Sequence, residues 1–172
     1  MSKILFRSTN RNSEKITFRE ALLRGQAPDY GLYMPTTLPK ISEEKIKSFK
    51  SMGYSQISFE VFSAFLGDEI EKEVLKKIVQ EIYSFDIPIQ KAINNFYIMW
   101  LTKGPTASFK DFAAMFMSKI MEYFAIKENK HLTILVATSG DTGGAVANAF
   151  HRLEKINVVI LFPKKEVTSR QR

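Results

Sequence analysis

Apolar residues along this chain follow two kinds of pattern, and the change between them divides the sequence. From residue 42 to about residue 88 they recur every three or four positions, which is typical of one face of a helix. The clearest stripe is Ile70, Val74, Ile78 and Ile82. We therefore expect three helices over residues 43–52, 59–66 and 69–85, the second preceded by Ser58. The apolar run within residues 93–101 predicts a strand.

The first forty residues combine short apolar runs with turn-forming residues. Residues 4–6 and 32–34 suit short strands. Thr17 precedes a stretch of helix-forming residues, and Glu20 lies three positions later, the spacing of a capping box. We expect a helix over residues 18–24, ended by Gly25, because glycine readily takes the backbone conformation that stops a helix.

The last third of the chain predicts a strand–helix–strand unit. Large apolar residues recur at helical spacing from Phe109 to Phe124. Two apolar runs follow, at residues 132–137 and 157–162, each suited to a buried parallel strand. A glycine-containing turn and a small-residue segment, 145–152, separate them. The predicted fold is α/β: a mostly helical N-terminal domain, residues 1–90, then a parallel-sheet domain, residues 91–172.

The composition of the chain argues against several classes of protein. The 172 residues are 45% hydrophobic and 25% charged, which is ordinary for a globular protein. No apolar run is long enough to predict a membrane span, and no signal peptide is evident. Cysteine is absent, which excludes disulfides and thiolate ligands, and the two histidines lack close ligand spacing. We expect no metal site, no membrane partner and a cytoplasmic protein.

The net charge of +7 has three interpretations. Basic residues gather near the end of the chain, at Arg152, Lys155, Lys164, Lys165, Arg170 and Arg172. They could bind nucleic acid, attract phosphorylated small molecules or simply form a solvated face. We favour the solvated face and expect no nucleic-acid partner, because the sequence holds no motif that reads a nucleic-acid groove.

One candidate for chemistry is Lys110, in the segment Gly-Pro-Thr-Ala-Ser-Phe-Lys-Asp at residues 104–111. Ser108 and Asp111 have the spacing of a capping box, which predicts that Lys110 lies in the first turn of a helix. The positive helix terminus and the flanking phenylalanines both favour a neutral amine, as a Schiff-base lysine requires. On this segment alone, an ordinary surface lysine is the more economical interpretation.

The second candidate is the segment Thr-Ser-Gly-Asp-Thr-Gly at residues 138–143, between a predicted strand and a predicted helix. Glycines allow a ligand to approach the backbone, and N–H groups at a helix start attract anions. The hydroxyls of Thr138, Ser139 and Thr142 add donors. The segment matches neither a dinucleotide fingerprint nor a P-loop. Either a small-anion site or a tight turn capped by Asp141 fits these residues.

Together the two segments resemble the threonine synthases, a family of fold-type II enzymes that use pyridoxal 5'-phosphate (PLP). Gly-Pro-Thr-x-x-Phe-Lys-Asp is similar to their cofactor-lysine motif, and Thr-Ser-Gly-Asp-Thr-Gly to their substrate-carboxylate loop. The opening residues match as well, in the stretches 18–25, 27–29, 31–35 and 65–70. The resemblance covers nearly the whole chain in order.

The resemblance implies that the enzyme converts O-phospho-L-homoserine and water to L-threonine and phosphate. Lys110 would carry PLP and move protons, with Phe109 and Asp111 holding it in position. Asp141 would lie near the 3-hydroxyl of the cofactor. The substrate carboxylate would be bound by the second segment, through Thr138, Ser139, Gly140, Thr142 and Gly143.

Two departures from the family qualify this expectation. Lys103 stands where the family usually has histidine, which could change phosphate handling. Family members are more than twice as long, and their later residues supply the cup for the PLP phosphate, so we expect these 172 residues alone to show little activity. The alternatives are another fold-type II enzyme, such as a threonine dehydratase, or a non-catalytic truncated protein that binds PLP or phosphorylated amino acids.

Overall fold

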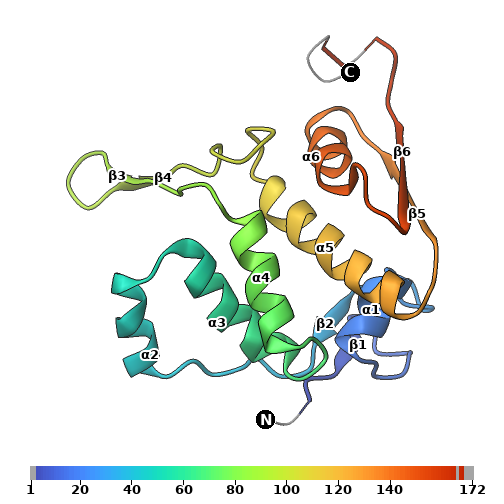
Figure 1. The fold of residues 1–172 in the computed structure, drawn as a ribbon, viewed down its shortest axis with the longest axis horizontal. Helices are drawn as coiled ribbons and strands as arrows, with labels where there is room; N and C mark the ends of the chain where they lie inside the picture. Colours follow the sequence, from blue (N-terminus) through green and yellow to red (C-terminus); the bar gives the residue numbers. More distant parts are fainter. Residues whose placement is uncertain (1–2, 166, 169–172) are drawn as a thin grey trace. The chain divides into compact units, whose positions relative to one another are not determined.

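The structure is a computed structural model that describes residues 3–165, 167 and 168. The chain folds as two compact units, Met1–Glu81 and Ile82–Arg172. Figure 1 shows helices in both units and small two-stranded sheets, the only sheets among the described residues.

The first unit begins with a strand–helix–strand arrangement. Strand β1 (Phe6–Ser8) pairs antiparallel with β2 (Tyr33–Pro35), and helix α1 (Phe18–Arg24) lies between them in sequence. The Phe6 ring packs 5.7 Å, centroid to centroid, from the ring of Phe18. Ile16 and Ala21 are buried in the same small core.

Helix α1 is capped at its start by two carboxylates. The predicted capping box is confirmed: Thr17 Oγ1 accepts from the Glu20 N–H at 3.2 Å, and Glu20 Oε2 accepts from the Thr17 N–H at 2.8 Å. The Thr17 N–H and the Thr17 hydroxyl, which donates to Glu20 Oε2 at 2.7 Å, lower the pKa of Glu20. Glu69, far away in sequence, accepts the N–H groups of Phe18 and Arg19 at 3.1 and 3.0 Å. The predicted helix range and its end at Gly25 are both confirmed.

A second carboxylate network holds the turn before β2. Asp29 accepts hydrogen bonds from the buried Ser8 hydroxyl at 2.5 Å and from the N–H groups of Asn12 and Gly31. These donors, the Ser8 hydroxyl first, lower the pKa of Asp29. A Cβ at Gly31 would lie 2.0 Å from Ser8 Oγ, so this close approach of two segments requires glycine.

The remaining elements of the first unit are helical, with bounds that differ from those predicted. They are α2 (Glu43–Ser48), the 3-10 turn η1 (Phe49–Ser51), α3 (Tyr54–Leu66) and α4 (Lys72–Ile82), which ends at the unit boundary. The predicted start of α3 after Ser58 is wrong, because Ser58 is buried inside that helix. The helix begins instead after Gly53, whose N–H donates to Gln56 Oε1 at 2.8 Å.

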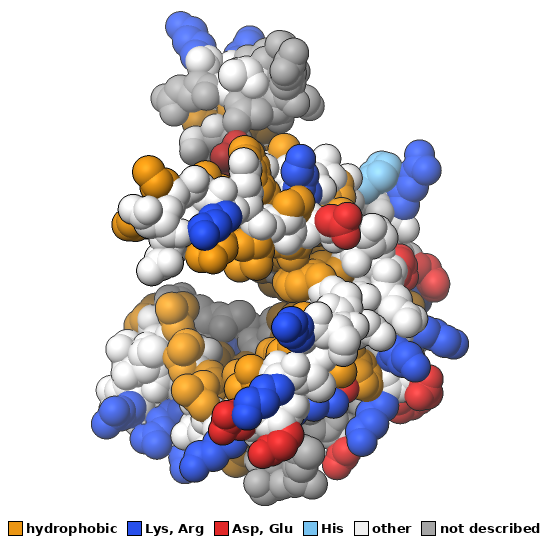
Figure 2. All heavy atoms as spheres, turned by 90° about the vertical axis from the view of Figure 1, so that its left-hand side faces the viewer, with side chains coloured by type: hydrophobic (Ala, Val, Ile, Leu, Met, Phe, Trp, Pro, Cys, Tyr) orange, Lys and Arg blue, Asp and Glu red, His pale blue; other side chains and the backbone are white. Residues whose placement is uncertain are grey.

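The second unit opens with a hairpin of which only one strand was predicted. Strand β3 (Ile89–Lys91) pairs antiparallel with β4 (Tyr97–Met99). Every residue from Ile89 to Trp100 is exposed. Figure 2 shows hydrophobic side chains at the surface on the side of the molecule where Figure 1 draws this hairpin, with Lys and Arg spread among Asp and Glu.

The predicted strand–helix–strand unit is confirmed. Helix α5 (Asp111–Lys127) is followed by β5 (Leu132–Ala137), α6 (Asp141–Phe150) and β6 (Ile156–Leu161). The two strands pair in parallel, from Leu132 opposite Ile156 to Ala137 opposite Leu161. Helix α6 packs against α5 and β6, and it begins four residues before the predicted small-residue segment.

The apolar runs predicted strands suited to burial, and in the described chain the strands are covered on one face only. Exposure alternates along both strands, and one face of the pair shows Leu135 at 64%, Val159 at 43% and Leu161 at 52% exposure. Only the other face is covered, by the helices of the unit. Of the predicted basic group near the end of the chain, Arg170 and Arg172 lie outside the described residues.

Candidate functional site

Lys110 lies immediately before helix α5, as its N-cap residue. Its N–H donates to Ser108 Oγ at 3.3 Å, and its carbonyl accepts from the Ala114 N–H at 3.0 Å. The backbone of Lys110 is therefore held on both sides. The sequence prediction placed Lys110 one step too far along, inside the first helical turn.

The predicted capping box between Ser108 and Asp111 is not formed. Helix α5 has no side-chain cap of its N-terminus, and the carboxylate of Asp111 turns back to Thr106 instead. Asp111 Oδ1 accepts the Thr106 hydroxyl at 2.6 Å, and Oδ2 accepts the Thr106 N–H at 2.9 Å. The carboxylate reaches these two donors because Thr106 lies in the turn that folds against the helix start. Asp111 is fully buried, with no exposed surface.

The side chain of Lys110 lies at an aromatic surface. Its Nζ atom is 4.9 Å from the centroid of the Phe109 ring, and that ring is 60% exposed. Lys110 itself is half-buried. Lys103, seven residues earlier, lies over a different ring, with its Nζ 5.9 Å from the Trp100 centroid.

The second predicted segment forms the turn from β5 into α6. Gly140 is the N-cap of α6 and has a φ of 151°, a value that favours glycine. Thr138 Oγ1 accepts the N–H groups of Gly140 and Gly143 at 3.1 and 3.2 Å. These two N–H groups thus hold the loop together in this structure, whereas the prediction gave them to a substrate. Ser139, Asp141 and Thr142 are exposed.

A hollow of about 100 Å³ adjoins this turn. One side of the hollow is lined by residues of the turn and the start of α6, namely Thr138, Gly140, Gly143 and Gly144. The rest of its lining is apolar and consists of Ala147, Ile160, Phe162 and Val167. Pockets that enclose a whole small-molecule ligand are several times larger. The hollow therefore has room for one end of a ligand, such as a carboxylate, but not for an entire substrate with its cofactor.

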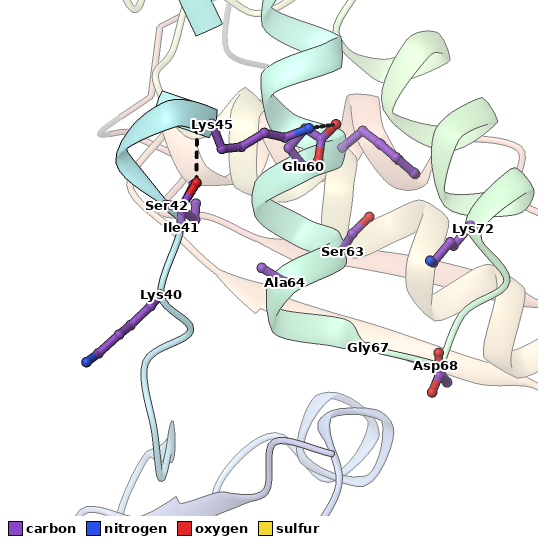
Figure 3. Close-up of a pocket in the computed structure, with 11 residues that line it drawn as sticks. Lys40, Ile41, Ser42, Lys45, Glu60, Ser63, Ala64, Gly67, Asp68 and Lys72 are labelled. Atoms are coloured by element: carbon purple, nitrogen blue, oxygen red, sulfur yellow. Dashed lines mark hydrogen bonds and ion pairs between the residues drawn. The ribbon is translucent and has the colours of Figure 1, made fainter. Parts of the chain in front are cut away.

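A larger hollow, of about 440 Å³, lies in the first unit between α2, α3 and the start of α4. Figure 3 shows the charged side chains around it. Lys45 Nζ is paired with Glu60 Oε1 at 2.6 Å, and Lys40 points away from the other labelled side chains. Its positive groups therefore do not converge on one point, and we assign it no ligand.

Neither a membrane span nor a metal centre is found in the described part of the chain. No helix there has the length and apolar character needed to cross a bilayer. Among the same residues, no group of three or more His, Asp or Glu side chains is arranged to hold a metal ion.

Sequence comparison relates the chain to known proteins. Residues 5–83 match the family described as Threonine synthase N terminus. The chain is 36% identical over 160 residues to threonine synthase from Escherichia coli (strain K12), covering 93% of this chain and 37% of the relative. It is 39% identical over 165 residues to threonine synthase from Buchnera aphidicola subsp. Schizaphis graminum, covering 95% and 38%.

Solved structures give the same relation. The crystal structure of PLP-bound threonine synthase from Brucella melitensis matches with a TM-score of 0.93 and 33% identity, over 98% of this chain and 37% of that one. Threonine synthase from Escherichia coli matches with a TM-score of 0.84 and 35% identity, over 94% and 37%.

The fold is that of the beginning of a fold-type II PLP-dependent enzyme, with a helical unit followed by the first parallel strands. Within that class, the N-terminal portion of the threonine synthases is what the chain is similar to, at 33–39% identity in the relatives described above. It spans somewhat more than a third of the length of the relatives it matches.

Proposed function

We propose that this chain is the N-terminal part of a PLP-dependent threonine synthase, which converts O-phospho-L-homoserine and water to L-threonine and phosphate. The observation that carries the proposal is the position of Lys110: a lysine held just before α5, four residues after Thr106 of the Gly-Pro-Thr turn. The similarity to threonine synthases over more than nine-tenths of the chain supports it.

The residues around Lys110 fit a PLP site on the observations above. Its amine lies at an exposed aromatic ring, and its backbone is fixed by Ser108 and Ala114. When bound, PLP supplies an electron sink for carbanions, which no side chain can provide. Lys110 would hold the cofactor covalently and then move protons at the α and β carbons of the substrate.

The turn at residues 138–143 is proposed to bind the substrate carboxylate. The exposed hydroxyls of Ser139 and Thr142 are its available side-chain donors, and the start of α6 favours an anion. The hydroxyl of Thr138 can still donate its own proton while it accepts the two glycine N–H groups. Asp141 is proposed to lie near the 3-hydroxyl of PLP.

Residues 1–90 are proposed to form the threonine synthase N-terminal domain, and residues 91–172 the first part of the PLP-binding domain. The family match to residues 5–83 supports the first of these. We further propose a cytoplasmic enzyme, which the lack of cysteine suits, because disulfides are rare in that compartment.

Reductive labelling tests the role of Lys110. The purified chain is mixed with PLP, treated with borohydride and digested, and the modified lysines are located by mass spectrometry. We expect Lys110 to be labelled preferentially, with Lys103 as the internal reference. The label at this position should be lost in Lys110→Arg. Labelling elsewhere, or none, would count against the assignment.

Activity of the longest protein that the reading frame encodes gives a second test. Supplied with O-phospho-L-homoserine, it should release phosphate and threonine in equal amounts. Dehydration of threonine without this turnover would identify a threonine dehydratase instead.

A further inference from the structure

The resemblance described above implies that Asp111 helps to position Lys110, but it does not say through which contacts; the buried carboxylate of Asp111 provides them. It has no exposed surface, and the hydrogen bonds that the structure gives it both come from Thr106. A buried carboxylate is costly unless its hydrogen bonds are well made, and replacing it by an apolar group would remove that cost. Its position next to Lys110 points to a use for it.

The carboxylate lies directly against the turn that leads to Lys110. A Cβ built on Gly104 would be 2.5 Å from Asp111 Oδ2 and 2.9 Å from Asp111 Cβ, so the turn can approach this closely only with glycine. The Ala107 N–H donates to the Gly104 carbonyl at 3.1 Å, which closes the turn.

The turn also holds one residue in an unfavourable conformation. Ala107 has a φ of 57°, in the left-handed region that costs a residue with a Cβ roughly 1 kcal/mol or more. Such a conformation persists when surrounding contacts enforce it. The two hydrogen bonds from Thr106 to Asp111 provide that enforcement, since they span the strained residue.

We propose that Asp111, Thr106 and Gly104 form a clamp that fixes the backbone on both sides of Lys110 and so sets the position of its amine. Asp111 is a positioning residue and does not itself contact the reacting atoms. This inference rests on the proposed function of Lys110, because the purpose of the clamp is to hold the cofactor lysine.

Conservative substitutions at Thr106 separate this role from general stability. Thr106→Val keeps the shape and the N–H but removes the hydroxyl, whereas Thr106→Ser keeps both donors. A hydrogen bond to a charged group contributes enough that its loss should speed local opening of residues 104–111 by roughly tenfold or more. Hydrogen exchange of these amides, followed by mass spectrometry, measures that opening.

The positioning role is read by PLP labelling with borohydride, as the ratio of adduct at Lys110 to adduct at Lys103. We expect Thr106→Val to lower this ratio at least several-fold at a temperature where circular dichroism shows the variant folded. Thr106→Ser should restore it. Asp111→Asn should behave as Thr106→Val does if it folds.

Each outcome bears on one part of the inference. An unchanged labelling ratio in Thr106→Val, with exchange faster or not, would show that Asp111 has a structural role only and would overturn the proposal. If the unsubstituted chain shows no preference for Lys110, the proposed function fails instead. Hydrogen exchange then decides the clamp alone: faster exchange in Thr106→Val supports it, and unchanged exchange refutes it.

Discussion

Two adjacent glycines at the start of α6 should respond in opposite ways to the same added methyl group. A Cβ on Gly144 meets nothing within 4 Å, and a Cβ on Gly143 would lie 2.4 Å from Thr138 Cγ2 and 3.1 Å from Ile160 Cγ2. Both residues lie in the helix, so both substitutions gain the same helix propensity. Only Gly143→Ala must also displace its neighbours.

The magnitudes follow from these distances. Replacing glycine by alanine inside a helix stabilises by about 1 kcal/mol, which is the full effect expected for Gly144→Ala. Overpacking a well-filled site costs about 1–3 kcal/mol, which offsets that gain at Gly143. We expect the free energy of unfolding of Gly143→Ala to lie about 1–3 kcal/mol below that of Gly144→Ala.

Urea unfolding followed by circular dichroism measures this difference. With a slope of about 2 kcal/mol per molar urea, the two midpoints should differ by roughly 0.5–1.5 M. Thr138→Ser removes the methyl group that the new Cβ would strike and keeps the oxygen that accepts the Gly140 and Gly143 N–H groups. The double variant Gly143→Ala/Thr138→Ser should therefore recover most of the loss. Equal midpoints for the two alanine variants, or no recovery in the double variant, would refute the steric argument.

Two further predictions concern carboxylates of the first unit. Glu69→Ala should lower the free energy of unfolding by about 1–2 kcal/mol, because it removes two charge-assisted hydrogen bonds at the start of α1. The control is Asp68→Ala at the exposed neighbouring residue, which should change that free energy little. Equal effects of the two substitutions in urea unfolding would contradict the capping role of Glu69. The pKa of Asp29 is lower in the folded protein than its ordinary value of 3.8. The ionised carboxylate therefore stabilises the fold fully above pH 3.8, and this stabilisation is lost as the pH falls through the lower folded-state pKa. The melting temperature should therefore fall on acidification below pH 3.8, and it should fall less in Asp29→Asn, measured by circular dichroism.

Local signals in the sequence predicted local structure well. The capping box of Thr17 and Glu20 and the strand at residues 132–137 were predicted with the bounds that the structure has. Both depend on residues close together in the chain or on a continuous apolar run. The sequence placed Lys110 in the first turn of a helix, whereas it lies one residue before α5 and the capping box expected there is not formed.

The sequence did not predict which of two nearby residues would donate hydrogen bonds to the carboxylate of Asp111. Asp111 has both Ser108 and Thr106 within reach, and the sequence rule for capping selects Ser108. The structure selects Thr106, because the left-handed Ala107 turns the chain back and brings both Thr106 donors to the carboxylate. No spacing rule signals that turn, so Thr106 was not recognised as part of the candidate site.

The exposed face of the β5–β6 sheet shows a different limit of sequence patterns. An apolar run predicts that a strand is suited to burial, but it does not say whether the covering elements belong to the same stretch of chain. In the described residues, helices cover one face only, and Leu135, Val159 and Leu161 remain on the other. The chain spans somewhat more than a third of the length of the relatives it matches.

The cap that Glu69 gives to α1 has a consequence for how the chain acquires its structure during synthesis. Helix α1 has seven residues, too few to be stable alone in water, and its first two N–H groups bind a carboxylate that is about fifty residues further along. At the usual rates of translation, those residues take roughly three to ten seconds to be added. Until Glu69 has left the ribosome, α1 lacks those two hydrogen bonds. A ribosome that pauses before residue 69 would therefore hold α1 without the part of its N-terminal cap that Glu69 supplies.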